Sequence, residues 1–220
     1  MNMRLIVVAI ICIFVLGIAE SAAVVSAGIS IGVKKGDWIE YNVVATGNFP
    51  GESNAQLARL EIVDVQGDII LINSTTMLTN GSYVYANVIV NFDTGNLEEG
   101  FFVPSNVSVG GVFYDSLVGN ITVSGMEQNT YAGALRTVLT GISSESTFVW
   151  DKAKGILVEA HSTYPEYNFT YDTIVDKTNM WTPQILGLEP VTFYILIGAA
   201  ALAIVVVVAG VLIWHKRKSQ

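Results

Sequence analysis

Residues 147–164 read TFVWDKAKGILVEAHSTY, and this stretch decides the fold class. Two runs rich in apolar and β-branched residues flank the polar segment Asp151–Gly155. Asp151 can cap a tight turn with its carboxylate, and Gly155 can take the left-handed conformation that a hairpin loop of three to five residues needs. The pattern therefore predicts a β-hairpin.

Similar runs, bounded by turn residues, occur in both directions along the chain. The strands expected are Trp38–Thr46, Leu57–Val65, Asp68–Ser74, Val84–Phe92, Phe101–Pro104, Val112–Tyr114, Gly119–Ser124, Tyr131–Thr140, Thr147–Trp150, Ile156–Tyr164 and Tyr167–Val175. The alternation changes phase at Val63, as a β-bulge would make it do, and Glu52–Arg59 could instead form a short helix. About ten strands with short links predict an all-β domain. Its topology would be an antiparallel meander or a Greek key, built as a sandwich or an open half-barrel.

The two ends of the 220-residue chain carry its longest apolar runs. Leu5–Ile18 follows Arg4 and is too short to cross a bilayer, so residues 1–27 are interpreted as a signal peptide. Cleavage after Ala27 is preferred; cleavage after Ser21 and an uncleaved signal anchor are the alternatives.

Val191–Trp214 is long enough to cross a bilayer as a helix, and the basic residues of the tail 215–220 follow it directly. The positive-inside rule keeps such a tail in the cytoplasm. The chain is therefore predicted to be a type I single-pass protein of the cell membrane. Its ectodomain would comprise residues 28–175, followed by a stalk of residues 176–190.

The segment between residues 28 and 190 is acidic, with seven basic and 18 acidic residues and a net charge of −11. This charge argues against binding of nucleic acid, which needs a basic face. The single cysteine, Cys12, lies in the N-terminal apolar run, so a cleaved chain would have no disulfide. Five Asn-x-Ser/Thr acceptors predict N-glycosylation of this segment, at Asn73, Asn80, Asn106, Asn120 and Asn168.

Catalytic motifs are hard to find in this sequence. His161 is the one histidine of the predicted ectodomain, and strand alternation places it on a polar face. A zinc site needs three or four ligands and a Ser-His-Asp triad needs a positioned histidine, so no catalytic residue and no cofactor is expected. A pair of carboxylates could still support glycoside hydrolysis, which ranks third among the functions considered.

Two groups of residues remain as candidate binding sites. A polar loop near residues 91–100 could wrap a calcium ion, although a simple hairpin loop is favoured; its candidate ligands are Asp93, Asn96, Glu98 and Glu99. Aromatic side chains two apart on single strands could line a ligand groove, although such rows more often form packing contacts; they are Tyr83, Tyr85, Tyr167, Phe169 and Tyr171.

The segment VKKGDWIEY of residues 33–41 resembles the start of uncharacterised archaeal cell-surface proteins. The likeness continues through residues 102–104, 131–136 and 150–159, and those proteins share the order of signal peptide, β-rich ectodomain, membrane helix and basic tail. The hairpin at residues 150–159 is also similar to one in LolA/LppX-like carriers. That second resemblance implies a half-barrel that holds lipid, but this sequence lacks the amphipathic helices with which those carriers plug the barrel.

The sequence as a whole predicts a membrane-anchored, N-glycosylated surface interaction or envelope protein without catalysis. The alternative is a carrier or sensor of an apolar or lipid ligand, held in a curved sheet. The expected partners are the lipid bilayer, through Val191–Trp214, and an extracellular protein, glycan or apolar ligand of unknown identity.

Overall fold

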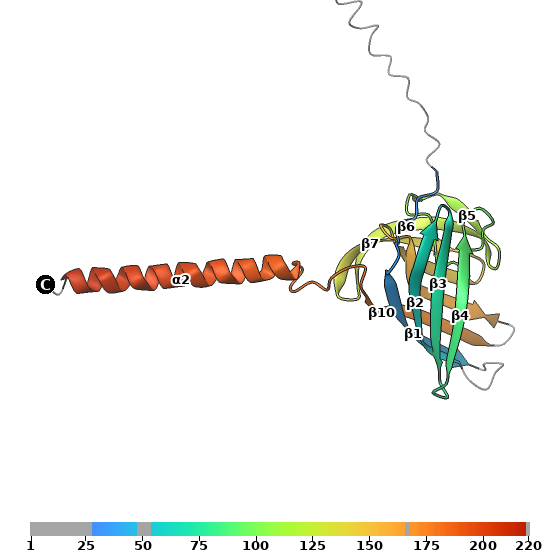
Figure 1. Cartoon of the computed structure of the whole chain (residues 1–220), viewed down its shortest axis with the longest axis horizontal. Helices are drawn as coiled ribbons and strands as arrows, with labels where there is room; N and C mark the ends of the chain where they lie inside the picture. The colour runs from blue at the N-terminus through green and yellow to red at the C-terminus, as the bar shows by residue number, and fades with distance from the viewer. Residues whose placement is uncertain (1–27, 48–53, 166–167, 219–220) are drawn as a thin grey trace, which may run out of the picture.

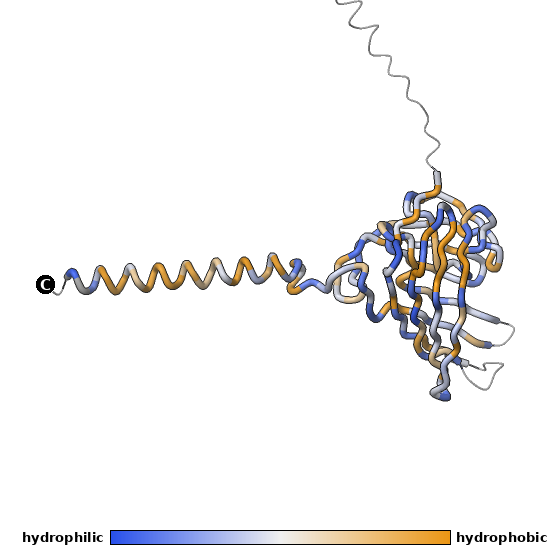
Figure 2. The backbone as a smooth tube through the Cα atoms, viewed as in Figure 1, coloured by the Kyte–Doolittle hydropathy of each residue, from blue (hydrophilic) through white to orange (hydrophobic). Residues whose placement is uncertain are grey.

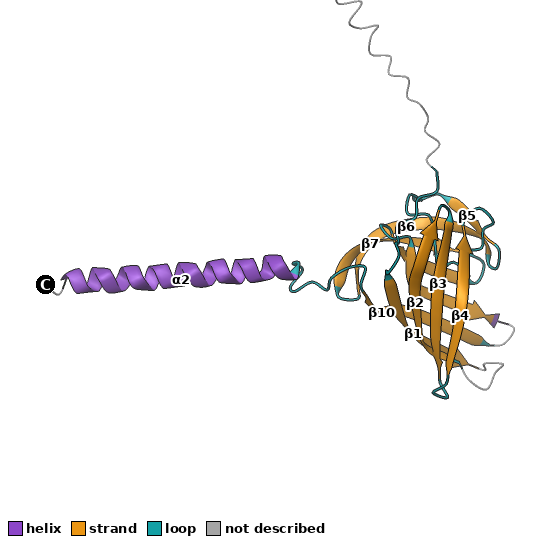
Figure 3. Ribbon diagram, viewed as in Figure 1, coloured by secondary structure: helices purple, strands orange, loops and turns teal. Residues whose placement is uncertain are grey.

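The computed structural model describes residues 28–47, 54–165 and 168–218. Figures 1 and 3 show a β-domain followed by one long helix, α2. The predicted signal peptide, residues 1–27, lies outside the described residues.

Ten strands form one antiparallel sheet in the order β4-β3-β2-β1-β10-β9-β8-β7-β6-β5. The strands are β1 (Trp38–Gly47), β2 (Ala55–Gln66), β3 (Ile69–Leu78), β4 (Tyr83–Asn91), β5 (Val112–Asp115), β6 (Gly119–Tyr131), β7 (Ala134–Ile142), β8 (Ser146–Asp151), β9 (Ile156–Tyr164) and β10 (Phe169–Thr178). Nearly all neighbours in the sheet are also neighbours in sequence, and β1 pairs with β10 in the middle. The all-β prediction is confirmed, and the architecture is an open, curved meander.

This topology leaves β4 and β5 at opposite edges of the sheet although they are consecutive in the chain. Residues 92–111, which we call the crossing loop, must therefore pass from one edge to the other. The loop runs along β9, where the Val103 N–H donates to the Gly155 carbonyl and the Leu157 N–H donates to the Phe101 carbonyl. It thereby covers part of the inner face of the sheet.

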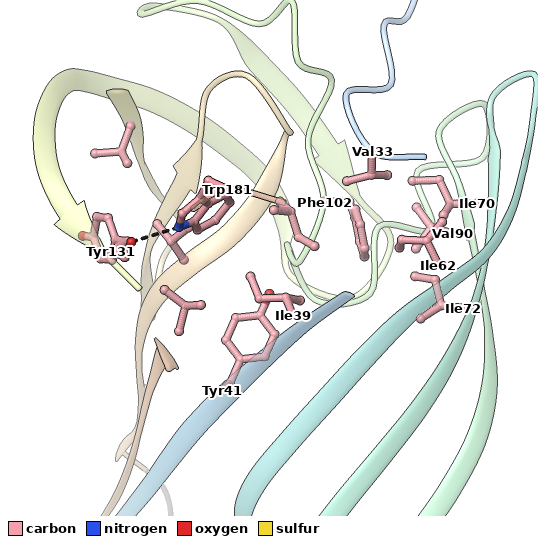
Figure 4. Close-up of a cluster of buried hydrophobic side chains, with 14 of the residues drawn as sticks. Val33, Ile39, Tyr41, Ile62, Ile70, Ile72, Val90, Phe102, Tyr131 and Trp181 are labelled. Carbon is pink, nitrogen blue, oxygen red and sulfur yellow. Dashed lines mark hydrogen bonds between the residues drawn. The ribbon is translucent and has the colours of Figure 1, made fainter. Parts of the chain in front are cut away.

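The core lies between the curved sheet and the crossing loop (Figure 4). Ile39 and Tyr41 of β1 face Phe102 of the loop, and all three are essentially inaccessible to solvent. The Tyr41 hydroxyl donates to the Leu157 carbonyl at 2.8 Å, so its one buried polar group has a partner across the core. This burial raises the pKa of Tyr41 well above its ordinary value.

The β8–β9 hairpin has the geometry that its sequence predicts, and its turn is a point of contact for several elements. Gly155 has φ +62°, and a side chain there would lie 2.1 Å from the Val103 carbonyl oxygen. Asp151 is fully buried, accepts a hydrogen bond from the Lys154 N–H, and pairs with Arg136 of β7 at 2.7 Å. Lys154 in turn reaches Asp37 at 3.1 Å, which ties the turn to the start of β1.

Local predictions differ in their outcome. The bulge expected at Val63 is confirmed, because the register of β2 against β3 shifts between Ile62 and Asp64. The strand expected at Phe101–Pro104 is wrong: only an isolated bridge, from Phe102 to Ile156, forms there, since the crossing loop lies over the sheet and is not part of it. The alternative of a helix over Glu52–Arg59 is contradicted from Ala55 onward, where the chain is already in β2.

Part of the segment expected to be a stalk is packed against the domain. β10 continues to Thr178, and Trp181 is buried with its indole N–H donating to the Tyr131 carbonyl (Figure 4). The Arg136 guanidinium lies 4.7 Å from the centre of the Trp181 ring. The Gln184 N–H then donates to the Gly133 carbonyl, so the chain leaves the domain beside the β6–β7 turn.

Helix α2 (Pro190–Lys218) is apolar along most of its length, as Figure 2 shows. Residues 190–215 are long enough as a helix, at about 39 Å, to cross the roughly 30 Å hydrocarbon core. Its apolar side chains are exposed in the isolated chain, as expected for a helix whose surroundings are lipid. It is the one helix of this kind in the part of the chain that the structure describes.

Replacing Gly155 with alanine should destabilise the domain more than the same change at Gly67. Gly67 also has positive φ (+59°), but a Cβ atom added there would meet nothing within 4 Å, so Gly67→Ala should cost only the left-handed penalty of about 1 kcal/mol. Gly155→Ala adds the overlap with Val103 and should cost about 3 kcal/mol, a fall in Tm of roughly 6–12 °C. Thermal unfolding followed by near-UV circular dichroism measures both, and equal losses would contradict the close approach.

Candidate functional site

A pocket of about 650 Å³ lies on the inner face of the sheet, at the end of the sheet where β8 and β10 begin. The crossing loop forms part of one wall, and the β7–β8 turn forms part of another. Its lining consists of Val43, Ala55, Ala58, Thr76, Glu99, Phe101, Leu117, Val118, Ser143, Ser144, Glu145, Ser146, Phe148, Leu157, Ala160, Ser162, Tyr164, Tyr171 and Thr173.

Strand alternation explains the chemistry of the lining. Small and apolar side chains such as Ala58, Phe148 and Ala160 come from inward positions of β2, β8 and β9, which continue the core towards the end of the sheet. Towards the strand ends the inward positions change to hydroxyl-bearing residues, among them Ser146 and Ser162, which hydrogen-bond to each other at 2.9 Å. The pocket thus joins an apolar surface to a ring of hydroxyl groups.

The two charged residues of the lining are both acidic. Glu99 comes from the crossing loop and Glu145 from the β7–β8 turn. Among the described residues that line the pocket, none is lysine, arginine or histidine. The described part of the lining therefore carries negative charge without a basic side chain to neutralise it.

The backbone that carries Glu99 has an uncommon conformation. Glu98, Glu99 and Gly100 follow one another with φ values of 55°, 57° and 80°, a left-handed turn that side-chain-bearing residues rarely adopt. Two buried groups hold it in place. The Gly100 N–H donates to Asp115 at 3.0 Å, and its carbonyl accepts from the Trp150 indole at 2.6 Å.

Asp115 connects two parts of the pocket wall. One carboxylate oxygen accepts from Gly100, and the other accepts from the backbone N–H groups of Leu117 and Val118. Leu117 and Val118 line the pocket themselves. A single fully buried carboxylate thus fixes both the turn that carries Glu99 and the neighbouring rim.

The acidic groups here are held partly out of water and near one another. Glu99 keeps exposed atoms, but the concave protein surface around it excludes much of the solvent, and this desolvation raises its pKa, with the Asp115 charge adding to the effect. The pKa of Glu98 is raised by desolvation and by the Glu99 charge. Desolvation also raises the pKa of Tyr164, and the charges of Glu99 and Glu145 raise it further.

The aromatic residues predicted to form a groove are divided between the two faces of the sheet. Tyr171 lines the pocket, and Phe169 packs edge-on against it with ring centres 5.0 Å apart. Tyr83 and Tyr85 pair with Met77 and Thr75 on the outer face, where they stack on each other and are exposed. The structure therefore separates these two from Tyr171, and the predicted Tyr167 lies outside the described residues.

The four candidate calcium ligands lie around the turn that follows β4. The Asn96 amide group donates to the Ile89 carbonyl at 2.7 Å, and Asp93 is exposed at the tip of the turn. No group of three or more His, Cys, Asp or Glu side chains with metal-binding geometry occurs in residues 28–47, 54–165 and 168–218. Of the four, Glu99 is the one that lines the pocket.

His161 lies on the outer face in a hydrogen-bonded row. Its Nδ1 is 2.6 Å from Asp172, directly opposite on β10, and its Nε2 is 3.4 Å from the Thr163 hydroxyl. The order hydroxyl, imidazole, carboxylate is that of a catalytic triad, but the hydroxyl contact is long and the His–Asp pair is more than half exposed. We interpret the row as an ordinary cross-strand pair.

The five glycosylation acceptors occupy exposed positions in the structure. Asn73 lies on the outer face of β3, Asn80 in the β3–β4 turn, and Asn120 in β6. Asn106 in the crossing loop and Asn168 just before β10 are also exposed. The Asn106 amide is also hydrogen-bonded, since its Nδ2 donates to the Gly28 carbonyl at 2.9 Å.

No protein-family model and no curated protein matches the sequence. A protein of Bacteroides fragilis predicted to be exported, with a YmcC-like fold, is similar over 69% of this chain and 99% of its own, with 7% identity and a TM-score of 0.41. A predicted lipoprotein of Parabacteroides distasonis covers 69% of this chain and 100% of its own, with 9% identity and a TM-score of 0.39.

MucB is similar over 69% of this chain and 56% of its own length, with 12% identity and a TM-score of 0.37. At identities of 7–12% and TM-scores below 0.5, the roles of these three proteins have no bearing on the role of this chain. The resemblance of the sequence to archaeal surface proteins stays a prediction.

Glu99→Gln should stabilise the unliganded protein at neutral pH and not in acid. Because the folded state raises the pKa of Glu99, the ionised form destabilises folding at pH values above the raised pKa, and this cost disappears below the ordinary value of 4.5. The Tm of Glu99→Gln should therefore exceed that of the wild type at neutral pH, with the gap closing as the pH falls. Glu61→Gln, on the outer face of β2, is the matched control; a gap that persists in acid would contradict the assignment.

Proposed function

We propose that this chain is a non-catalytic, membrane-displayed binding protein that takes a small ligand with an apolar body into the pocket between the crossing loop and strands β1–β3 and β8–β10. Among the functions that the sequence leaves open, carriage or sensing of a ligand in a curved sheet is the one that the pocket supports best. The observation that carries the proposal is the 650 Å³ pocket, which continues the hydrophobic core into an accessible hollow.

The inner face of the sheet is filled at one end and hollow at the other. Near Trp181 and Phe102 the inner face is filled by the crossing loop and the segment after β10, so that end is a closed core (Figure 4). Near Ser162 and Tyr171 the same face is hollow. A domain that served only as a rigid interaction surface would gain stability by filling this hollow, since buried apolar contact stabilises folding.

The position of the pocket along β10 favours a ligand from the surroundings. Tyr171 is near the beginning of β10, while the chain departs towards α2 after Thr178, about 23 Å farther along the strand. The pocket therefore opens at the end of the strand remote from the exit to the membrane helix. A ligand arriving from the extracytoplasmic side would reach it without passing the bilayer surface to which the chain is anchored.

Glycans fit the same arrangement. Asn73, Asn80 and Asn120 lie on the outer face or in turns, and none of the five acceptors lines the pocket. Modification would raise the solubility of the displayed domain and leave the pocket free.

Filling the pocket should weaken binding without unfolding the domain. Thr173→Trp places a large side chain into the hollow, whereas Ile174→Trp places the same side chain on the exposed outer face one residue away. The probe is octanol, a neutral molecule with a short apolar chain, titrated by calorimetry into the full chain in lipid nanodiscs, with empty nanodiscs subtracted. We expect Thr173→Trp to weaken binding by about tenfold or more, and Ile174→Trp to leave it unchanged. Equal binding by both variants would contradict the proposal.

The orientation can be tested with a tag attached after Gln220. Because a basic cluster follows the apolar helix, the tag should be in the cytoplasm and resist protease added to intact cells, while the β-domain is digested. Permeabilised cells provide the control in which the tag is cleaved. Loss of the tag from intact cells would overturn the type I assignment.

A further inference from the structure

We infer that the ligand of this pocket carries a cationic head group, an amine or quaternary ammonium, that binds between Glu99 and Glu145. This inference rests on the proposed function and specifies the class of ligand. The apolar body would lie against the surface formed by Ala58, Phe148 and Ala160, with the head group at the acidic wall.

The two acidic residues come from different elements and line the same hollow. Glu99 is in the crossing loop and Glu145 is in the β7–β8 turn, and both line the pocket. Tyr164 lies within electrostatic reach of both, because both charges raise its pKa. A charged group near the Tyr164 hydroxyl would thus interact with two negative charges at once.

Neither carboxylate has a positive partner within the described part of the protein. The ion pairs of the described residues join other acids to basic groups, and no basic residue of the described chain lines the pocket. Most surface carboxylates avoid this situation by facing bulk water. At Glu99 the concave surface removes part of that water, so a cation gains more from this carboxylate than it would at an open surface, and the exposed Glu145 adds a second negative charge at the rim.

The structure also fixes Glu99 in its position. Its left-handed conformation is held by the bonds from Gly100 to buried Asp115 and Trp150. A carboxylate whose role was only to keep the domain soluble would need no fixed backbone. Strain of this kind, maintained by buried hydrogen bonds next to a hollow, is typical of a binding site.

An anionic ligand would be repelled by the same groups, and a neutral one would gain at most a hydrogen bond from them and no charge attraction. A bare metal ion would use the carboxylates but not the apolar surface, and the described residues bring no third acidic or histidine ligand to form a metal-binding group. An ammonium joined to an apolar chain is the chemistry that uses both parts of the pocket.

The test compares three octyl probes of equal chain length, octyltrimethylammonium, octanol and octanoate, each titrated into the full chain in zwitterionic lipid nanodiscs. EDTA is present throughout so that no metal ion can bridge an anion to the carboxylates. We expect the ammonium probe to bind most tightly and octanoate most weakly. The double variant Glu99→Gln, Glu145→Gln should weaken the ammonium probe by about tenfold, which corresponds to two partly exposed ion pairs, and should not weaken octanol.

The control variant is Glu61→Gln, Glu127→Gln, which makes the same change in net charge with two exposed carboxylates outside the pocket. It should bind the ammonium probe as the wild type does. If octanol and octanoate bind as tightly as the ammonium probe, or if the control variant loses as much affinity as the pocket variant, the cationic head group is wrong while the binding function stands. If no octyl probe binds, the proposed function itself fails.

Discussion

At Gly155 the chain turns with φ +62°, and the absence of a side chain there lets the Val103 carbonyl approach the turn directly. This approach fixes the crossing loop against β9, through the hydrogen bond from Val103 to Gly155 and the bond from Leu157 to Phe101. The rest of the domain depends on it, because β4 and β5 are at opposite edges of an open sheet and their connection has to cross the inner face. With the loop held on β9, Phe102 fills the closed end of the core and Phe101 becomes a wall of the pocket.

Three buried aspartates stabilise this arrangement at the turns. Asp37, Asp115 and Asp151 are at most 3% exposed, and each accepts hydrogen bonds from backbone N–H groups or pairs with a basic side chain. A buried carboxylate is costly unless it is bonded in this way. Each of the three also links segments far apart in sequence: Asp37 contacts Lys154, Asp115 contacts Gly100, and Asp151 contacts Arg136. In a chain whose described domain contains no cysteine, these bonds take the place of cross-links.

The sequence predicts most of the strands because their pattern is local. Alternation in β1 and the turn residues Asp151 and Gly155 are sufficient to predict an antiparallel β-domain, and the phase change at Val63 predicts a bulge that is present. The pocket could not be predicted in the same way, since it arises from contacts between distant segments. Phe101–Pro104 has the composition of a strand, and only the edge positions of β4 and β5 make it a crossing segment.

The same limit applies to the individual residues of the site. Tyr83 and Tyr171 each belong to a strand with aromatic residues at every second position. The register of the sheet nevertheless puts the two tyrosines on opposite faces. Glu145 gives no local signal beyond its place in a serine-rich turn, and Tyr164 stands in the sequence only as the end of a strand. In the sequence, Glu99 is one acid among several in a polar loop. Its positive φ and its position in the pocket lining are seen only in the structure.

The backbone of Glu99 shows how an acidic side chain comes to line the pocket of an open sheet. A connection between two edges could turn at glycine or asparagine at little conformational cost, yet the crossing loop turns at two consecutive glutamates with positive φ. The bonds of Gly100 to Asp115 and Trp150 offset this cost, and the Glu99 side chain that results lies at the hollow end of the sheet, away from the packed end. One segment therefore has two roles, because the loop that closes the core at Phe102 also presents Glu99 to the pocket.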